Sequence, residues 1–356
     1  MPLHTLMKWG PFRLDALGLV TLIGAEEVNQ AVGSLVGSKY TVFLPLLGQY
    51  FITGNQFTES ISGFTLYNLT DAITTTTIAG WFSRWLRSQD LKTSTTAFEW
   101  TVLSKDKQRR EGKGLSLTLG SVIAGILLVL TTLIGDWWGI SNSIALVVSV
   151  FVRWYLVQEN NYGLDKSCEE ACYRSNTPQM TYRVKVLVTL DDGKMVTIYA
   201  PRGLVIGGFL RKPKPVNRKY YTWTRRLGWF FFGIHAIALG QCSLVTQLVT
   251  VAILVSSTWL VVRRYGCNEF NIGSSISIQQ IPRMSEEVDR RLWAYAKLQP
   301  TPDEEESLLD WNLLPRKVNK SWWTEYEHTK QSLRRPFQEK IYVSSCSSVR
   351  SDSELS

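Results

Sequence analysis

The stretch LSLTLGSVIAGILLVLTTLIGDWWGISNSIALVVSVFVRWYLV, residues 115–157, decides the fold of this chain. Residues 115–135 carry no charge, and residues 137–157 form a second apolar run after the pinch GDWWG at residues 135–139. A membrane span needs about 20 such residues to cross roughly 30 Å of hydrocarbon, and in lipid the backbone of each run is satisfied only within a helix. We therefore predict a transmembrane hairpin over residues 115–157.

The alternative to this hairpin is a pair of buried helices in a soluble protein. The first run lacks the polar stripe that helices of soluble proteins normally show, which favours the membrane. Arg153 lies one turn from the end of the second run, where we expect its long side chain to snorkel to the headgroups.

Residues 228–262 repeat the arrangement in a tighter form. Aromatic residues 229–232 open it, residues 240–243 form the turn, and residues 244–262 return. Each arm is near the short end of the spanning range of about 17 to 25 residues, so one long tilted helix with an interfacial aromatic segment is the alternative. We predict an α-helical multi-pass membrane protein with two transmembrane helical hairpins, a small cytoplasmic loop containing a β-hairpin, and a helical soluble tail.

The charge distribution predicts the orientation of the protein. The net charge is +9, and residues 158–226 alone carry 13 basic against 6 acidic residues. Basic residues flank the predicted spans, whereas both hairpin turns lack Lys and Arg. By the positive-inside rule both termini and the basic loop 158–226 are cytoplasmic, and the sequence does not specify the organelle. The mean hydropathy of −0.04 requires substantial polar parts beside the spans.

Basic residues alternate with aromatic ones directly before the second hairpin. A pI of about 9.3 in a soluble protein would suggest nucleic acid, but here the charges lie next to predicted spans. We therefore expect the lipid bilayer and its anionic headgroups as partners and no nucleic acid, with about 1 kcal/mol per basic residue near the surface. The expected headgroup-binding residues are Arg211, Lys212, Lys214, Arg218, Lys219, Arg225 and Arg226.

Residues 1–104 form the least readable region, expected to be mixed or irregular and membrane-associated in part. Residues 16–25 resemble a signal-peptide core without a cleavage site, so cleavage and retention both stay open. Residues 42–51 are apolar but too short to span, which favours a buried or interfacial segment. Residues 81–87 alternate aromatic and basic side chains. They predict either a short amphipathic helix lying on the membrane or a surface helix packed on a small core.

The loop and the tail contain shorter predicted elements. Alternation around Asp191-Asp192-Gly193 predicts a β-hairpin over residues 182–200, with a third strand over residues 204–210. In the tail, residues 263–343, we expect helices over residues 285–296, from Thr301 to near residue 314, and around Trp322. The Ser-rich end, residues 344–356, is expected to be disordered.

Two short patterns in the tail resemble sorting signals read by adaptor proteins on cytoplasmic tails. An acidic dileucine pattern runs over residues 304–309, and a tyrosine-based pattern runs over residues 295–298. A helix that packs its leucines inside explains the first pattern equally well. The side chains of these two patterns are Glu304, Leu308, Leu309, Tyr295 and Leu298.

Common catalytic motifs are absent from the sequence, and we predict no cofactor. His235 is the one ionisable group near the middle of a predicted span and is therefore a weak catalytic candidate; a hydrogen bond to a carbonyl of a neighbouring helix is the alternative. Cys168 and Cys172 share one helix face, but a zinc site usually needs two more ligands. We therefore predict no metal site.

Large parts of the chain are predicted to be cytoplasmic, and they contain no recognisable set of catalytic residues. We therefore predict a membrane scaffold, trafficking or accessory interaction protein with cytoplasmic protein partners. We favour a role other than catalysis. The first alternative is a membrane-bound enzyme or accessory subunit acting on an apolar substrate through His235 or the acidic residues Glu26, Glu27 and Asp71. The second is a small channel or transporter, which four spans without proline or buried charge would form only as an oligomer.

Overall fold

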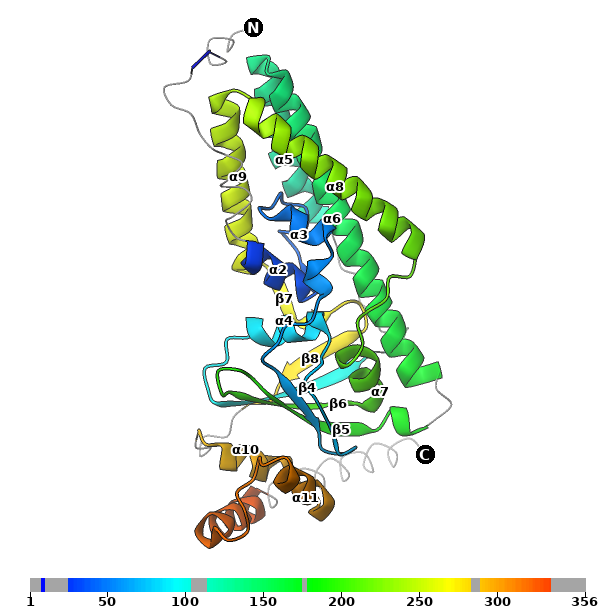
Figure 1. The fold of residues 1–356 in the computed structure, drawn as a ribbon, viewed down its shortest axis with the longest axis vertical. Helices are drawn as coiled ribbons and strands as arrows, with labels where there is room; N and C mark the ends of the chain where they lie inside the picture. Colours follow the sequence, from blue (N-terminus) through cyan, green and yellow to red (C-terminus); the bar gives the residue numbers. More distant parts are fainter. Residues whose placement is uncertain (1–7, 10–24, 104–113, 175–177, 283–288, 334–356) are drawn as a thin grey trace, which may run out of the picture.

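The computed structural model describes residues 8–9, 25–103, 114–174, 178–282 and 289–333. The described chain is elongated, with a bundle of long helices at one end, a β-sheet in the middle and a small group of helices at the other end (Figure 1). The long helices are α5 (Gly114–Ile134), α6 (Trp137–Glu169), α8 (Arg218–Gln241) and α9 (Leu244–Val262).

Three helices of the described residues are long and apolar enough to cross a membrane. They are Gly114–Ile134, the helix Trp137–Cys172 that continues α6, and Leu244–Val262. These helices are compatible with an integral membrane location. The predicted pair of transmembrane hairpins is not matched, because α8 is not among them. Its first turns contain Arg218, Lys219, Arg225 and Arg226, which make it more polar than its partner α9.

The sheet has eight strands in the order β1-β7-β8-β4-β6-β5-β2-β3. All neighbours are antiparallel except β4 and β6, which are parallel. The strands are β1 (Val36–Ser38), β2 (Thr65–Asn68), β3 (Ile73–Thr75), β4 (Thr95–Val102), β5 (Arg183–Thr189), β6 (Met195–Pro201), β7 (Cys267–Ile272) and β8 (Ile276–Gln280). Segments before, between and after the long helices therefore build one sheet.

The predicted β-hairpin over residues 182–200 is confirmed as β5 and β6, which pair from Arg183 with Pro201 to Thr189 with Met195. Gly193 supplies the positive φ of 80° that the turn requires, and Asp192 accepts a hydrogen bond from the Lys194 amide. The predicted third strand over residues 204–210 is wrong. This segment is helical, as α7 (Arg202–Leu204) and the π-helix η6 (Val205–Phe209), because its glycines allow close packing against α6.

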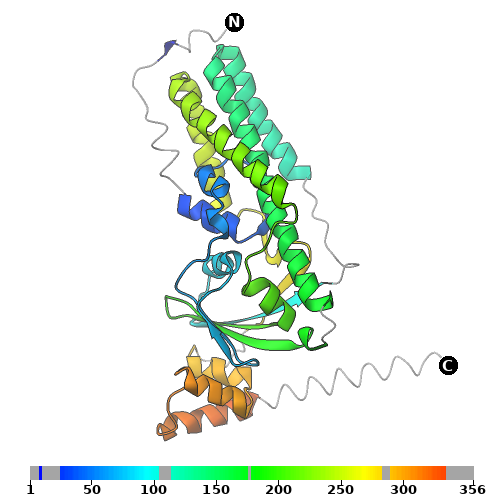
Figure 2. The same cartoon turned by 45° about the vertical axis from the view of Figure 1, so that its right-hand side comes forward.

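The two faces of the sheet pack against different helices, because successive side chains of a strand point to opposite faces. Val186 and Ile198 point into a core shared with α4 (Gly80–Ser88) and the lower half of α6. Leu187 and Met195 point to the other face, where the C-terminal helices pack. Figure 2 shows these helices as a separate layer beneath the sheet.

The segment over residues 81–87 lies in the core and not on a membrane surface. Trp81, Phe82, Trp85 and Leu86 of α4 are all buried, together with the side chain of Arg84. The rings of Trp81 and Phe82 pack against those of Trp100 and Phe209, and Phe82 stacks on Phe209 with centroids 4.0 Å apart. Of the two interpretations of this helix, packing on a core is therefore correct.

The remaining N-terminal elements connect the sheet to the bundle. They are α2 (Ala25–Gly33), α3 (Gln49–Thr53) and the 3₁₀-helix η2 (Gln56–Thr58). Most residues over 42–51 are buried between these elements and the long helices, as one of the two expectations required. Of the signal-like run over residues 16–25, all but the last residue lies outside the described residues.

Three helices of the described part of the tail, residues 289–333, lie on the outer face of the sheet. They are α10 (Arg291–Leu298), α11 (Pro302–Asp310) and a helix over residues 320–333. Thr301 caps α11 together with Glu304 in a reciprocal capping box, which confirms the predicted helix start. The start of the helix predicted over residues 285–296 and the Ser-rich end, residues 344–356, lie outside the described residues.

Candidate functional site

Polar side chains meet inside the helix bundle. Nδ1 of His235 on α8 lies 2.6 Å from Oδ1 of Asn142 on α6. The Asn142 amide nitrogen donates in turn to Oγ1 of Thr250 on α9, at 3.2 Å. The three side chains are buried. Hydrogen bonds of this kind hold helices together where lipid surrounds them. The partner of His235 on the neighbouring helix is a side-chain amide oxygen, where the alternative interpretation expected a carbonyl of that helix.

A second polar contact joins the two turns of the bundle. The carboxylate of Asp136 caps α6 by accepting a hydrogen bond from the Gly139 amide at 2.9 Å, and it accepts another from the Ser243 amide at 2.7 Å. Ser243 itself is the N-cap of α9. Sequence reasoning missed this link, although a single carboxylate in an otherwise uncharged turn was a signal for it.

The outer surface of the bundle is apolar. On α5, Val122, Ile126 and Val129 are 58%, 58% and 59% exposed, whereas Ser116 and Thr131 are fully buried. The most exposed side chains of α5 are therefore apolar, although Thr118, Ser121 and Thr132 are exposed among them, whereas the exposed face of a helix in a soluble protein is mainly polar. An exposed apolar surface of this extent marks contact with a membrane or another protein.

Aromatic side chains lie at both ends of this apolar surface. Trp137 and Trp138 are exposed at the turn between α5 and α6. At the opposite end, Trp223 of α8 and Trp259 of α9 are exposed, and each has a guanidinium over its ring. Interfacial belts of membrane proteins have this composition.

The seven predicted headgroup-binding residues fall into two groups. Arg225 and Lys212 have partners within the protein: Arg225 donates to the carbonyls of Thr53 and Gly54, and Lys212 pairs with Glu59 at 2.9 Å. The other five are exposed. They are Arg211, Lys214, Arg218, Lys219 and Arg226, of which Arg226 lies 5.7 Å from the ring of Trp223.

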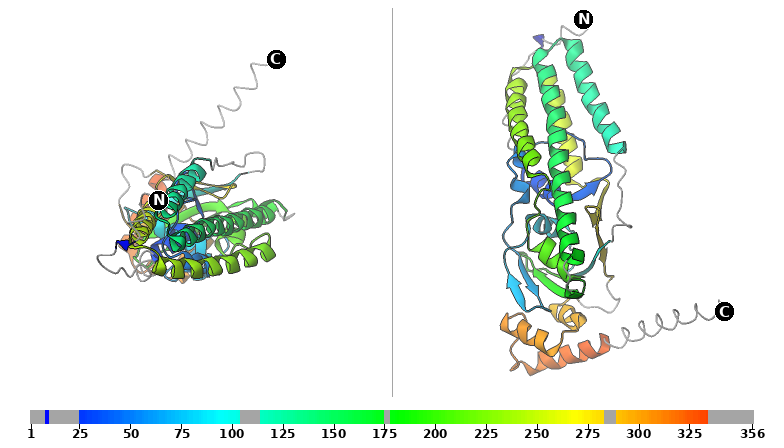
Figure 3. Two further views of the ribbon diagram at one scale, coloured as in Figure 1. Left: turned by 90° about the horizontal axis from the view of Figure 1, so that it is seen from above. Right: turned by 90° about the vertical axis from the view of Figure 1, so that its right-hand side faces the viewer.

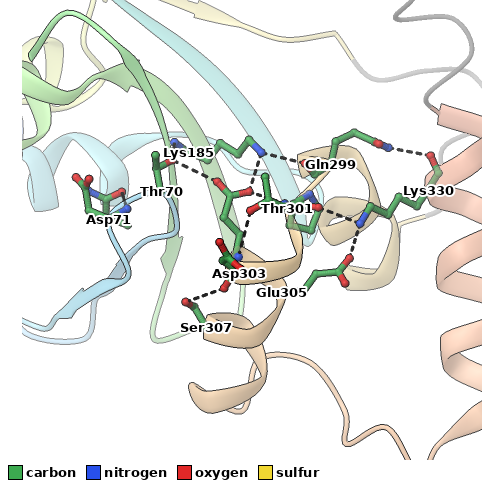
Figure 4. Close-up of polar contacts among 12 residues, drawn as sticks. Thr70, Asp71, Lys185, Gln299, Thr301, Asp303, Glu305, Ser307 and Lys330 are labelled. Carbon is green, nitrogen blue, oxygen red and sulfur yellow. Dashed lines mark hydrogen bonds and ion pairs between the residues drawn. The ribbon is translucent and has the colours of Figure 1, made fainter. Parts of the chain in front are cut away.

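The side chains of the two sorting patterns are not available to an adaptor protein in this fold. Tyr295, Leu298 and Leu308 are buried in the core between tail and sheet, and Leu309 packs against it. Glu304 is buried too; it caps α11 and pairs with Lys185 of β5 at 2.8 Å. Figure 4 shows the polar contacts that join β5, α11 and the last helix. The helix with its leucines packed inside is the correct interpretation.

The acidic residues of the enzyme alternative do not form one site. Glu26 and Glu27 lie at the start of α2, which contacts α9. Asp71 lies after β2, where it accepts a hydrogen bond from Asn68 and pairs with Arg202 at 2.9 Å. The structure thus gives Asp71 a structural partner and separates it from His235.

The two cysteines on one helix face are both buried at the end of α6. Among the described residues, no group of three or more His, Cys, Asp or Glu side chains is placed to hold a metal ion. Gly203 packs directly on Cys172, because a Cβ at this glycine would lie 2.7 Å from the sulfur. In the described part of the chain both cysteines act as small core residues.

A pocket lies where the bundle meets the sheet domain. It is bounded by α2 and β1, by the segment that follows β1, by the lower part of α6, and by the end of α9. Arg153 and Arg264 both line it. Arg153 is 4% exposed and donates to the carbonyl oxygen of Val42, so the expectation that it snorkels outward along the lipid is wrong. Segments of the chain on several sides surround this side chain in the structure.

Comparison with protein-family models, with curated proteins and with solved structures finds no match for this chain.

Proposed function

We propose that the chain is an integral membrane protein that spans the bilayer with α5, α6, α8 and α9. The distribution of side chains in the bundle supports this proposal: the outer surface is apolar, the polar contacts lie inside, and tryptophans lie at both ends. α8 is the least apolar of the four. Its hydrogen bonds to α6 and its position beside α6 along the bundle support a fourth span (Figure 3).

In this arrangement the sheet and the tail lie on the cytoplasmic side, together with both termini. The charges support this orientation. Arg225 and Arg226 lie at the sheet end of α8, and Arg263 and Arg264 follow α9, whereas the turns at the other end contain Asp136 and no Lys or Arg. Positive residues are enriched on the cytoplasmic side of membrane proteins.

We further propose that the protein acts as a membrane scaffold or accessory interaction protein. The observation that carries this proposal is the continuity of α6, which runs 33 residues from the bundle into the core of the sheet domain. Leu156, Leu164 and Cys168 on its lower half are fully buried in that core. A sheet mounted on a spanning helix keeps a fixed orientation to the membrane, which suits the presentation of a surface to cytoplasmic partners.

The exposed basic residues at the base of α8 fit anionic headgroups in the same arrangement. Arg218 and Lys219 begin the helix, and Arg226 lies at the level of Trp223. Each basic residue near an anionic surface adds about 1 kcal/mol of attraction, which orients the sheet domain against the membrane.

The experiment that tests the orientation is a topology map in sealed vesicles. Single glycosylation acceptors and single cysteine labels are placed at Ser60, Asp136, Asp192 and Gln241. We expect modification from the luminal side only at positions 136 and 241. Luminal modification at position 60 or 192 would contradict the proposed four-span arrangement.

The role itself is tested by crosslinking in intact membranes followed by purification of the full chain. A scaffold or accessory protein is expected to purify with the same partner proteins in stoichiometric amounts as wild type and as the His235→Ala variant. A monomer without partners, combined with loss of a cellular product in the His235→Ala strain at unchanged protein level, would contradict the proposal and favour an enzyme.

A further inference from the structure

The pocket at the base of the bundle, called the Arg153 pocket below, is lined mainly by apolar side chains together with Arg153 and Arg264. About 770 Å³ of space free of protein atoms lies in and in front of it, part of which is open solvent. Its apolar lining consists mainly of Val32, Val36, Val42, Leu46, Val157 and Val261.

The guanidinium of Arg153 is incompletely satisfied. Its Nη2 donates to the Val42 carbonyl, but Nη1 is buried and has no hydrogen-bond partner among the described residues. No ion pair of Arg153 occurs in that part of the chain either. Arg264, on the opposite wall, differs: it pairs with Glu269 at 3.2 Å and donates to Ser34. The pocket therefore holds one uncompensated positive charge.

The comparison with Arg84 shows how this chain usually treats a buried arginine. Arg84 is 2% exposed, and its guanidinium donates to the carbonyls of Gln56, Glu59 and Gly80 and to the side chain of Asn29. A buried charge without such partners costs several kcal/mol. An anion bound at Arg153 Nη1 would remove this cost through a charge-assisted hydrogen bond.

The level of Arg153 along α6 indicates the source of the anion. Arg153 follows Trp137 by 16 residues, which corresponds to about 24 Å of helix. In the membrane arrangement proposed above, on which this step rests, that distance places its guanidinium within reach of the lipid phosphates on the sheet side. The valines of the pocket then lie beside the acyl chains.

A second group without a partner lies on the same face of α6. Positions 153, 157 and 161 are spaced by four residues, so all three face the pocket. The buried Oδ1 of Asn161 has no hydrogen-bond partner among the described residues. Asn161 follows Arg153 by eight residues, about 12 Å of helix rise toward the sheet, so a headgroup that reaches both side chains extends from the Arg153 guanidinium toward the sheet.

We infer that the Arg153 pocket binds an anionic phospholipid with a hydroxyl-bearing headgroup. The phosphate accepts a hydrogen bond from Arg153, the acyl chains contact the valines, and a headgroup hydroxyl donates to Asn161. A soluble phosphate ester that carries a hydroxyl group would offer the same hydrogen-bonding groups as this phospholipid. The experiment distinguishes these two sources.

The test is thermal unfolding of the detergent-purified full chain, followed by tryptophan fluorescence. The probes are dioleoylphosphatidylglycerol, dioleoylphosphatidylcholine with the same chains but no net charge, and free sn-glycerol 3-phosphate. We expect phosphatidylglycerol to raise the midpoint temperature of the wild-type protein at concentrations where the other two do not, because binding to the folded state alone stabilises it.

The deciding variant is Arg153→Gln, with Arg87→Gln as the matched control. Arg87 is an exposed arginine of α4 and does not belong to the basic group at the base of α8. We expect Arg153→Gln to weaken the phosphatidylglycerol effect about tenfold or more, the equivalent of roughly 1.4 kcal/mol, and the control to leave it unchanged. Should Arg153→Gln not fold, Val32→Phe fills the pocket without changing the charge and is expected to abolish the effect.

A second measurement uses Cys267, which lines the pocket and is partly exposed, whereas the cysteines at 168, 172 and 242 are buried. In a Cys346→Ser background we expect phosphatidylglycerol to slow maleimide labelling of Cys267.

Three results would overturn the inference. The first is an equal rise of the midpoint temperature with phosphatidylglycerol in wild type and in Arg153→Gln. The second is a rise with phosphatidylcholine as large as that with phosphatidylglycerol. The third is a rate of maleimide labelling of Cys267 that phosphatidylglycerol does not change. An equal effect of free glycerol phosphate would assign the pocket to a soluble ester and overturn its lipid source. Because these measurements are made in detergent, the proposed topology can fail in vesicles while the anion site stands.

Discussion

The side chain of Asn142 contacts His235 of one neighbouring helix, with 2.6 Å between Oδ1 and Nδ1, and Thr250 of another, with 3.2 Å between Nδ2 and Oγ1. One amide thus joins α6 to both α8 and α9. Between helices that lipid surrounds, there is no hydrophobic driving force for association. Polar contacts of this kind and close packing therefore decide which helices associate.

We predict that Asn142→Leu destabilises the bundle. The substitution removes both interhelical hydrogen bonds and leaves His235 buried without a partner. Single contacts of this kind in membrane proteins contribute about 0.6 kcal/mol on average and up to about 1.7 kcal/mol, so we expect a total loss of about 1 to 2 kcal/mol. The measurement is the midpoint of denaturation of the protein in mixed micelles.

A double-mutant cycle with His235→Ala assigns the effect to the contact. The two substitutions should be clearly non-additive, because each removes the same hydrogen bond. The control is Ile144→Ala on the exposed side of α6, which changes no interhelical contact of this kind. Strict additivity of Asn142→Leu and His235→Ala would show that the contact does not stabilise the bundle.

We predict that Glu304→Gln loosens the tail from the sheet. The Glu304 carboxylate accepts hydrogen bonds from the Lys185 ammonium at 2.8 Å and from the Thr301 amide at 2.9 Å. Hydrogen bonds to charged groups contribute about 1.5 to 3 kcal/mol. We expect roughly 1 to 2 kcal/mol less protection, measured by amide hydrogen exchange over residues 302–310 and 320–333, since the glutamine keeps part of the capping box.

The matched control for this variant is Glu306→Gln, which changes the same charge on the exposed face of α11. Its effect on exchange should stay within about 0.5 kcal/mol, as for most surface substitutions. Equal exchange in the two variants would mean that the contact between Lys185 and Glu304 does not hold the tail.

We predict that Arg84→Met destabilises the sheet domain by about 3 kcal/mol. The buried guanidinium donates to the carbonyls of Gln56, Glu59 and Gly80, and methionine removes all three hydrogen bonds. Burial lowers the pKa of Arg84 to about 10, which is still high enough to keep the group charged at neutral pH. Denaturant titration followed by tryptophan fluorescence measures the loss, because three tryptophans surround this position.

Two further variants test the geometry of this site. Arg87→Met, one turn further on the exposed face of α4, should change the stability little. Arg84→Lys should not rescue the domain, because an ammonium lacks the planar fork that reaches several acceptors at once. A lysine variant as stable as the wild-type protein would show that the charge alone is sufficient.

Local patterns predicted their own elements correctly. The charge-free run before Gly135 is α5, the alternation around Gly193 is the hairpin of β5 and β6, and Thr301 with Glu304 caps α11. Each of these signals lies within one element, so the sequence contains all of the information that the prediction needs.

Elements whose partners lie far away in the sequence were not predicted. β1 pairs with β7, so that Val36 opposes Ile272, and β4 pairs with β6 in parallel across the first two long helices. Such pairing depends on how the long helices pack, because their packing decides which distant segments of the chain lie next to each other. The packing of α4 on a core was one of two interpretations and could not be chosen for the same reason, because its partner Phe209 comes from a segment that was predicted as a strand.

The headgroup contact expected from the basic residues near the span ends stays a prediction. Sequence alone could not tell that Arg225 binds the carbonyls of Thr53 and Gly54 while Arg226 stays exposed. Neighbouring residues of one helix face different directions, and the face that is covered depends on α3. For the same reason Arg153 was expected at the lipid and lies in a pocket of the protein.

The interface between tail and sheet is expected to fail at alkaline pH. Burial raises the pKa of Tyr199 and of Tyr295 to about 12, and burial together with the hydrogen bond to Glu305 raises that of Tyr326. In the unfolded chain a tyrosine ionises near pH 10. The folded pKa values are higher, so the stability from these neutral phenols is present below about pH 10 and is lost as the pH rises toward 12. We therefore expect the tail to separate from the sheet in this window, with tyrosinate absorbance and hydrogen exchange changing together.

Tyr199→Phe removes one ionisation and should shift the transition to higher pH, whereas Tyr182→Phe, an exposed position beside β5, should not. If Tyr199→Phe leaves the transition where it is, ionisation at this interface does not cause the separation.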